Sequence, residues 1–524
     1  MNNTWKITLV LALALCLLVG CGSSAASAAA PAASSAPQES GSAEAAASAA
    51  TVSVSERDAS GDYDVAKAVT LAPGDELTIT KAGVYILSGS YENSTLVIEA
   101  GEQDKVQLVL ENAELTNESG PAIYVRSADK VFLTAAEGTV NTISDGADYT
   151  RVDGGTTLDA AVFSKADLTI NGAGKLTING NCKHAVVSKD ELVVTAKDLV
   201  VNAVNVGLNG KDAVTLSEAS VSITAGSDGI RADNTEDAER GTVAVADSQL
   251  TIVSGKDGIQ AETSFIAENA ELSITAGGGS GAKAGSGTES CQGIQAGTTM
   301  RFNGGSYRID ALDDAIHAGD SILVAAGDFL LQSGDDGLRA NERLEIAGGT
   351  LDITASEGLE ATEVLLSGGD VTIRAADDGV NAAQKSAVLT PKVEISGGTL
   401  SITMGAGDTD GIDSNGDLLI SGGSISINAG SPFDYMGSVS FTGGTVTVNG
   451  EELSTISNQS FGGFGGHGGP GGFGGMGGRP EGFGNRPEGF EVPEDFDPSQ
   501  GFGDLPEGFD PSQGFGGGHR GRNA

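Results

Sequence analysis

The chain has 524 residues, 29 of them basic and 71 acidic, which gives a formal net charge of -42. This charge argues against nucleic acid or an anionic membrane surface as a partner and favours cations. With 79 glycines, 5% aromatic residues and short runs of Val, Ile, Leu and Thr, the composition is typical of thin β-strands joined by tight turns.

The first segment predicts export. An apolar run at residues 7–19 follows Lys6 and ends in LVGC, whose cysteine is Cys21. This pattern resembles a bacterial lipoprotein signal, residues 1–20, cleaved so that Cys21 carries a lipid. The alternative is an ordinary secretory signal with an incidental cysteine. With lipidation, we expect the protein on the extracellular face of the bacterial cell membrane, held there only through its lipid.

Residues 21–60 are rich in Ala and Ser, contain two prolines and show no strand pattern, so they predict a flexible tether. The ordered domain is predicted at residues 61–455. In its first segments, 77–91, 94–100 and 106–115, apolar and polar residues alternate between turn signals, as they do in β-strands.

A short motif then recurs: Gly or Ala followed by an aliphatic residue and, from position 207 on, by a polar residue as well. Its Gly or Ala stands at positions 122, 161, 185, 207, 229, 258, 293, 315, 337, 358, 379 and 411. Several steps are 21 or 22 residues. Longer steps of 29 (229 to 258), 35 (258 to 293) and 32 residues (379 to 411) absorb polar or small-residue loops at 234–241, 276–290 and 382–391.

A second series of strands falls between these motifs, each after Gly-Gly or an equivalent turn. It comprises residues 170–178, 216–223, 246–252, 267–274, 303–309, 347–353, 367–373, 396–402, 421–427 and 442–448. One repeat therefore has three short strands and about 22 residues, the size of one coil of a parallel β-helix. We predict one all-β domain of this kind.

Two further expectations concern the cysteines and the C-terminal region. Cys182 and Cys291 lie four repeats apart, or about 19 Å at about 4.8 Å per coil, beyond the reach of a disulfide. We expect two thiols. Residues 456–524 consist largely of Gly, Phe and Pro with PEGF and DPSQGFG repeats, which predicts a disordered tail. That tail either binds wall polymer weakly or serves as a solvated spacer.

Several blocks resemble a known family. They include ITKAGVYILSGSY (79–91), VQLVLENAELTNESGPAIYV (106–125), FLTAAEGTVNTISDG (132–146) and AAVFSKADLTINGAGKLTING (160–180). Together with the repeated motif, they closely resemble exported bacterial proteins described as carbohydrate-binding domain-containing, over about residues 65–450. The resemblance implies a right-handed parallel β-helix related in shape to pectate lyases. It also implies calcium-binding acidic residues and recognition of plant-type or wall polysaccharides, including acidic ones.

The polar residue of the motif should point outward, because successive side chains of a strand alternate. This outward row comprises Arg231, Gln260, Gln295, His317, Arg339, Glu360, Asn381 and Asp413. At a spacing of about 4.8 Å the row suits a polymer lying across several coils. The candidate carbohydrate-binding residues are His317, Arg339, Glu360 and Asn381, with His317 expected to face solvent.

An acidic row precedes the motif. It comprises Asp228, Asp257, Gln292, Asp314, Asp336, Glu357, Asp378 and Asp410, and a second Asp stands before it at 313, 335 and 377. Stacked like charges repel by about 1 kcal/mol in water and invite calcium, which accepts about six to eight oxygen ligands in loose geometry. The candidate calcium ligands are Asp313, Asp314, Asp335, Asp336, Asp377, Asp378, Asp410 and Asp413. For single aspartates, a structural role in the Asp-Gly turn is the simpler interpretation.

Catalysis is the less favoured function. A lyase on this scaffold would use calcium and a base such as Arg339 or Arg231. However, the Arg-x-Pro-x-x-Arg and Trp-x-Asp-His signatures of pectate lyases are absent, and Trp5 is the one tryptophan. We therefore predict a monomeric, non-enzymatic protein that uses calcium to bind a polysaccharide, for example polygalacturonate. The alternatives are a calcium-dependent polysaccharide lyase and a structural surface spacer or adhesin.

Overall fold

The computed structural model describes residues 52–73, 77–283, 291–405 and 409–457. In these ranges the chain is nearly all β: a four-residue helix, α1 (Glu56–Ala59), and a short 3-10 helix, η1 (Val65–Lys67), precede the strands. The all-β prediction is confirmed. The expected signal segment with Cys21, most of the expected tether and nearly all of the expected tail lie outside the described residues. No helix within the described ranges has the length and apolar character needed to cross a bilayer.

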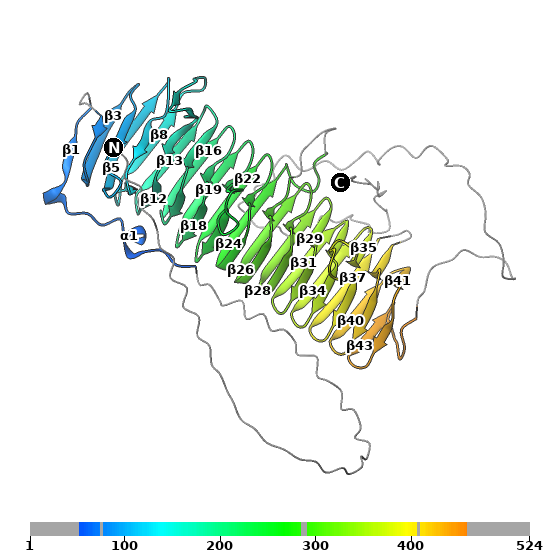
Figure 1. Cartoon of the computed structure of the whole chain (residues 1–524). Helices are drawn as coiled ribbons and strands as arrows, with labels where there is room; N and C mark the ends of the chain where they lie inside the picture. Colours follow the sequence, from blue (N-terminus) through cyan, green and yellow to red (C-terminus); the bar gives the residue numbers. More distant parts are fainter. Residues whose placement is uncertain (1–51, 74–76, 284–290, 406–408, 458–524) are drawn as a thin grey trace, which may run out of the picture. The chain divides into compact units, whose positions relative to one another are not determined.

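Two sheets contain almost all of the described strands (Figure 1). The large sheet has 27 strands in the described residues. They are β1 (Val69–Leu71), β3 (Gly83–Tyr91), β5 (Lys105–Asn117), β7 (Lys130–Ala135), β8 (Val140–Asp145), β12 (Asp167–Gly172), β13 (Lys175–Gly180), β15 (Glu191–Val194), β16 (Asp198–Ala203), β18 (Ala213–Ser217), β19 (Ser220–Ala225), β21 (Thr242–Ala246), β22 (Gln249–Ser254), β24 (Phe265–Ala276), β26 (Thr299–Ala311), β28 (Ser321–Ser333), β30 (Arg343–Ile346), β31 (Thr350–Ala355), β33 (Glu363–Leu366), β34 (Asp370–Ala375), β36 (Lys392–Ile395), β37 (Thr399–Met404), β39 (Asp417–Ile420), β40 (Ser424–Asn428), β42 (Val439–Phe441), β43 (Thr445–Val448) and β44 (Glu451–Glu452).

The small sheet has 15 strands in the same ranges. They are β2 (Thr78–Ile79), β4 (Leu96–Glu99), β6 (Ile123–Ser127), β11 (Ala160–Ser164), β14 (His184–Ser188), β17 (Leu208–Gly210), β20 (Ile230–Ala232), β23 (Ile259–Ala261), β25 (Ile294–Ala296), β27 (Ile316–Ala318), β29 (Asp336–Ala340), β32 (Glu357–Ala361), β35 (Asp378–Ala382), β38 (Asp410–Ser414) and β41 (Ser431–Tyr435). A separate antiparallel hairpin joins β9 (Val152–Asp153) to β10 (Thr156–Thr157).

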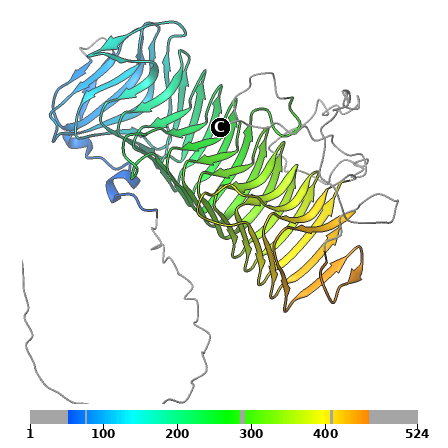
Figure 2. The same cartoon turned by 45° about the vertical axis from the view of Figure 1, so that its right-hand side comes forward.

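The strands follow one another in coils, and each coil pairs in parallel with the next (Figure 2). For example, β18, β19 and β20 form one coil and pair with β21, β22 and β23 of the following coil. In β24, β26 and β28 the two large-sheet segments of a coil merge into one long strand. Most other coils contain two strands of the large sheet and one of the small sheet.

The predicted register of the repeated motif is confirmed along the small sheet. The aliphatic residues pair in the expected order: Ile123, Val162, Val186, Leu208, Ile230, Ile259, Ile294, Ile316, Leu338, Leu359, Val380 and Ile412. The longer steps do not change this register, since Ile259 still pairs with Ile294 across a step of 35 residues.

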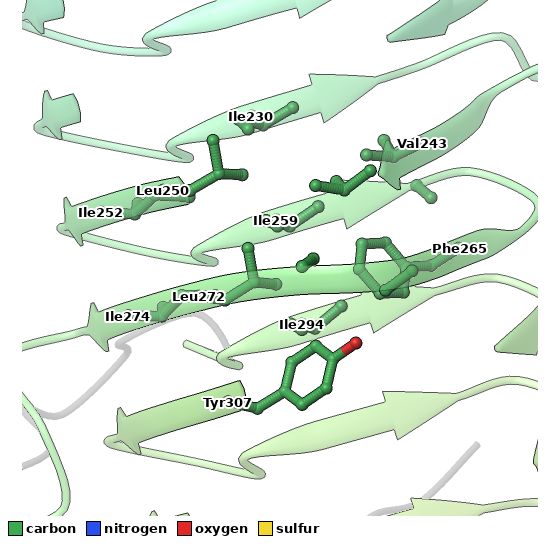
Figure 3. Packing of buried hydrophobic residues seen from close by; sticks show 14 of the residues in the cluster. Ile230, Val243, Leu250, Ile252, Ile259, Phe265, Leu272, Ile274, Ile294 and Tyr307 are labelled. Carbon is green, nitrogen blue, oxygen red and sulfur yellow. The ribbon is translucent and has the colours of Figure 1, made fainter. Parts of the chain in front are cut away.

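The core consists of aliphatic columns inside the stack (Figure 3). Ile230, Ile259 and Ile294 are fully buried in one column, and Leu250 and Leu272 belong to another. Burying such a side chain contributes about 1.5–3 kcal/mol, so regular repetition of aliphatic residues stabilises the stack coil by coil. The structure also holds Cys182 and Cys291 as thiols, as predicted.

The expected tether differs from the structure where the two overlap, at residues 52–60. Here α1 lies against β12 on the outside of the large sheet (Figure 1). Asp58 is buried and bonded to the sheet, and Ser55 caps the helix by accepting from the Asp58 amide. The Ala- and Ser-rich composition gave no indication of this contact, because the contact depends on one charged residue, Asp58.

Candidate functional site

The outward row of polar residues forms on the outer face of the small sheet as predicted. Its members pair in sequence from Arg231 to Gln260 and Gln295, and then through His317, Arg339, Glu360 and Asn381 to Asp413. Consecutive β-strands lie about 4.8 Å apart, so the part of the row from Arg231 to Asn381 extends over about 29 Å.

These side chains are more buried than an outward row would suggest. Glu360 and Asn381 are 6% and 9% exposed, and the expected solvent-facing His317 is mostly covered as well. One cause is the loop at 382–391, which folds back over the row. Its Lys385 Nζ lies 2.7 Å from Glu360 Oε1. The row is therefore a partly desolvated surface.

Four buried side-chain atoms in the described residues make no hydrogen bond, and all four belong to the outward row. They are Arg231 Nε, His317 Nε2, Arg339 Nε and Asn381 Oδ1. A buried polar atom without a partner costs about 1–3 kcal/mol, so such atoms are rare unless water or a ligand satisfies them. Three of the four lie on candidate carbohydrate-binding residues.

His317 is a hydrogen-bond donor in this arrangement. Its Nδ1 lies 3.1 Å from the Gln292 side-chain nitrogen and 3.5 Å from Asp314 Oδ2. In the tautomer whose Nδ1 accepts from Gln292, the proton of the neutral ring sits on Nε2. Burial, followed by the charge of Arg339, lowers the pKa of His317 to about 4. The ring is therefore neutral at physiological pH and presents an N–H group.

Asp313, Asp314 and Asp335 form the first carboxylate cluster, with one oxygen from each within 4.8 Å of the others. These residues precede β27 and β29. Asp314 is buried, and its Oδ1 accepts from the Asp336 amide at 3.2 Å. Burial, and then the neighbouring charge of Asp313, raises the pKa of Asp314 to about 7. A cation here would relieve the repulsion between these groups.

Asp336, Glu357 and Glu360 form the second carboxylate cluster, again within 4.8 Å. This cluster has cations of its own. Arg339 lies 3.4 Å from Asp336 Oδ2 and 3.5 Å from Glu360 Oε2, and Lys385 binds the other oxygen of Glu360. The eight predicted calcium ligands are thus not equivalent: Asp336 belongs to a cluster that the protein itself largely neutralises.

The remaining predicted ligands do not join a group of three in the described part of the chain. Asp378 and Asp410 are paired in register, and the Asp410 amide donates to Asp378 Oδ1 at 3.3 Å. Burial, and then Asp410, raises the pKa of Asp413 to about 6. Asp377 directly precedes β35.

Some of the acidic row has a structural role that the Asp-Gly turn hypothesis only partly anticipated. Asp257 Oδ1 accepts a hydrogen bond from the backbone N–H of Gln292, one coil further on, at 2.7 Å. Asp314 and Asp378 accept from the following coil in the same way. These side chains therefore tie consecutive coils together. Sequence reasoning also missed Lys385, because the sequence of a loop does not show which strand a loop side chain will contact.

The Lys385–Glu360 pair yields a stability prediction. We expect Lys385→Met to lower the free energy of unfolding by about 3 kcal/mol, because it leaves a buried carboxylate with only Arg339 nearby. Urea denaturation measures this loss. The control is Lys197→Met, which removes a similar ammonium 3.2 Å from the exposed Glu218 and should leave stability nearly unchanged. Equal effects of both variants would contradict the role of Lys385.

The sequence profile of a family described as carbohydrate-binding domain-containing protein matches residues 73–337 and 335–461. A protein of that same description from Acetivibrio thermocellus is 35% identical over 66 residues, which are 13% of this chain and 23% of the relative. The chain thus matches about a quarter of that relative's length.

A solved structure is also similar in part. It is described as a polysaccharide lyase-like protein from C. thermocellum, gadolinium derivative. The two sequences are 28% identical, the match covers 40% of this chain and 91% of the other, and the TM-score is 0.37.

Proposed function

Because the chain belongs to the family of carbohydrate-binding domain-containing proteins, we propose that it binds an acidic polysaccharide with calcium along the outward row. We further propose that the coils form a right-handed parallel β-helix, and that the protein is exported, lipid-anchored through Cys21 and monomeric. Polygalacturonate represents the proposed polymer class.

The observation that carries this proposal is the set of unpartnered buried atoms in the row. His317 and Arg339 stand on adjacent coils, and His317 Nε2 makes no hydrogen bond within the described protein. Arg339 Nε makes none either, although it is ion-paired with Glu360 Oε2 at 3.5 Å. Asn381, two coils beyond Arg339, adds an unpartnered acceptor oxygen. Sugar hydroxyl and carboxylate groups supply the complementary acceptors and donors, and a polymer would meet them in succession.

Calcium enters the proposal through the first carboxylate cluster. Asp313, Asp314 and Asp335 offer only oxygen ligands, the type that calcium prefers, and they lie beside the row. When bound there, calcium would supply positive charge that a sugar carboxylate can share. Without it, an acidic polymer would meet a chain of net charge -42, and the encounter would be repulsive.

The lyase alternative lacks a suitable base among these residues. Burial opposes the charged form of Arg339, but Asp314, Glu360 and Asp336 together raise its pKa, so it stays protonated. His317 is neutral, and in the tautomer whose Nδ1 accepts from the Gln292 side chain, Nε2 carries the proton and cannot act as a base. Binding is therefore the function that this geometry supports best. The spacer or adhesin alternative predicts no sugar binding at all.

Retention on immobilised polygalacturonate tests the proposal. We expect retention in calcium, at least a tenfold loss in chelator, and a similar loss in Asp313→Asn/Asp335→Asn, because the cation then lacks its carboxylates. The control, Glu191→Gln/Asp198→Asn, removes two exposed charges from the large sheet and should bind normally.

Two outcomes would overturn this assignment. Retention that ignores both chelator and the Asp313→Asn/Asp335→Asn change would exclude calcium bridging at the first cluster. Unsaturated product, detected by its ultraviolet absorbance and lost in Arg339→Ala, would show a lyase instead.

A further inference from the structure

The N-terminal strap, residues 52–68, crosses the outer face of the large sheet and is fixed there by Asp58. The buried Asp58 carboxylate lies 2.7 Å from Lys130 Nζ and accepts from Thr169 Oγ1 at 2.5 Å. Burial alone would raise the pKa of Asp58, but Lys130 and the hydroxyls of Ser55 and Thr169 bring it below its ordinary value. The carboxylate is therefore an ionised, buried anchor.

Polar side chains of the sheet also hold the strap backbone. Asn171 Nδ2 donates to the carbonyls of Asp58 and Ser60, at 3.2 and 3.1 Å. Gln107 donates to the Asp62 carbonyl at 3.4 Å. Gly61 passes so close that an added Cβ would lie 3.1 Å from Gly172 Cα. These contacts hold the strap at a fixed distance from the sheet, so that the strap forms one wall of the space beside it.

A cleft of about 630 Å³ opens between this wall and the sheet. Its polar lining includes Asp62, Tyr63, Glu111, Asn112, Glu137 and Lys197. The Tyr63 hydroxyl donates to Glu111 Oε1 at 2.8 Å, so one carboxylate has a set position and keeps its second oxygen for another donor.

We propose that this cleft is a second carbohydrate site, specific for a neutral sugar. Three carboxylates, those of Asp62, Glu111 and Glu137, accept hydrogen bonds from sugar hydroxyls, and the ring of Tyr63 adds an apolar surface. The same carboxylates repel a uronate, and Lys197 is already paired with Glu218. This inference rests on the proposed function only in taking a carbohydrate as the ligand. The cleft differs from the outward row in the charge of the sugar it prefers, in needing no cation and in its location.

The cleft and the outward row can be tested separately. In an array of neutral oligosaccharides, probed in chelator with the full chain, we expect binding to at least one neutral glycan. Titration calorimetry with that glycan should show at least a tenfold loss of affinity in Glu111→Gln and in Tyr63→Ala. Glu137→Gln removes an exposed carboxylate of the cleft, so it should weaken binding without threatening the fold. Glu271→Gln, which removes an exposed carboxylate of β24 outside the cleft, is the control.

The outcomes of these experiments distinguish the cleft proposal from the outward-row proposal. If no neutral glycan binds in chelator, or if binding survives all three cleft variants, the second site is wrong. Calcium-dependent retention on polygalacturonate should persist in Glu111→Gln and be lost in Asp313→Asn/Asp335→Asn. A failure of the cleft proposal therefore leaves a different pattern from a failure of the outward-row proposal.

Discussion

Replacing Phe302 with alanine is expected to lower the free energy of unfolding by about 4 kcal/mol. Phe302 is fully buried in β26, and its ring centroid lies 5.6 Å from that of Phe265, 5.1 Å from Tyr307 and 5.3 Å from Phe329. Alanine would leave a cavity in the middle of this aromatic cluster, which the rigid coils on both sides cannot close. Urea denaturation followed by circular dichroism measures the loss.

The loss should be local as well as large, because each coil of a stacked repeat contacts mainly its neighbours. Amide hydrogen exchange should accelerate first in β24, β26 and β28, which hold the aromatic cluster. Phe302→Leu, which keeps most of the apolar volume, should cost much less. A uniform rise in exchange across all coils, or an equal loss in Phe302→Leu, would contradict the local cavity explanation.

Raising the pH from 5 to 9 in chelator is expected to destabilise the protein. Burial, together with neighbouring carboxylates, raises the pKa of Asp257 to about 7, that of Glu357 to about 7 and that of Asp378 to about 8. The folded protein therefore holds more protons than the unfolded chain between about pH 4 and pH 8. The free energy of unfolding must fall as the pH rises through this window.

The size of this effect follows from the individual groups. A carboxyl whose pKa moves from 3.8 to about 7 on folding contributes about 4 kcal/mol at low pH, which is lost above its folded pKa. Urea denaturation at pH 5, 7 and 9 measures the slope. Asp257→Asn should flatten it, because that side chain no longer titrates, and calcium should restore stability at pH 9. A stability that rises with pH would refute the buried, proton-binding state of these carboxylates.

The sequence predicted the coil register well because the signal is repeated and local. A Gly or Ala followed by an aliphatic residue marks each small-sheet strand, and the match of Ile259 to Ile294 survives a 35-residue step. At Gly337 the reason for the small residue is visible: an added Cβ would lie 2.4 Å from Ile353 Cγ2 and 2.6 Å from the Gly358 carbonyl oxygen. Because the same close approach is repeated from coil to coil, the small residue of the motif is repeated as well.

The site was less predictable because it depends on contacts between different coils and loops. The sequence indicated that Asp313, Asp314, Asp335 and Asp336 belong to one acidic row. It did not show that Asp336, which pairs with Arg339, belongs to a separate cluster. The burial of the outward row depends on loop conformation as well as strand alternation. The strap escaped notice since its one decisive residue, Asp58, stands in a stretch without periodicity.

The strap also determines how the stack would respond to tension. A pull on the segment that precedes Asp58 would reach the Lys130 ammonium, the Thr169 hydroxyl and the Asn171 amide at once, on β7 and β12. Force would then enter the stack sideways, several coils in from its first strand, and would have to break these bonds together in shear. The hydrogen bonds of the first coil would then not be broken one after another by that pull.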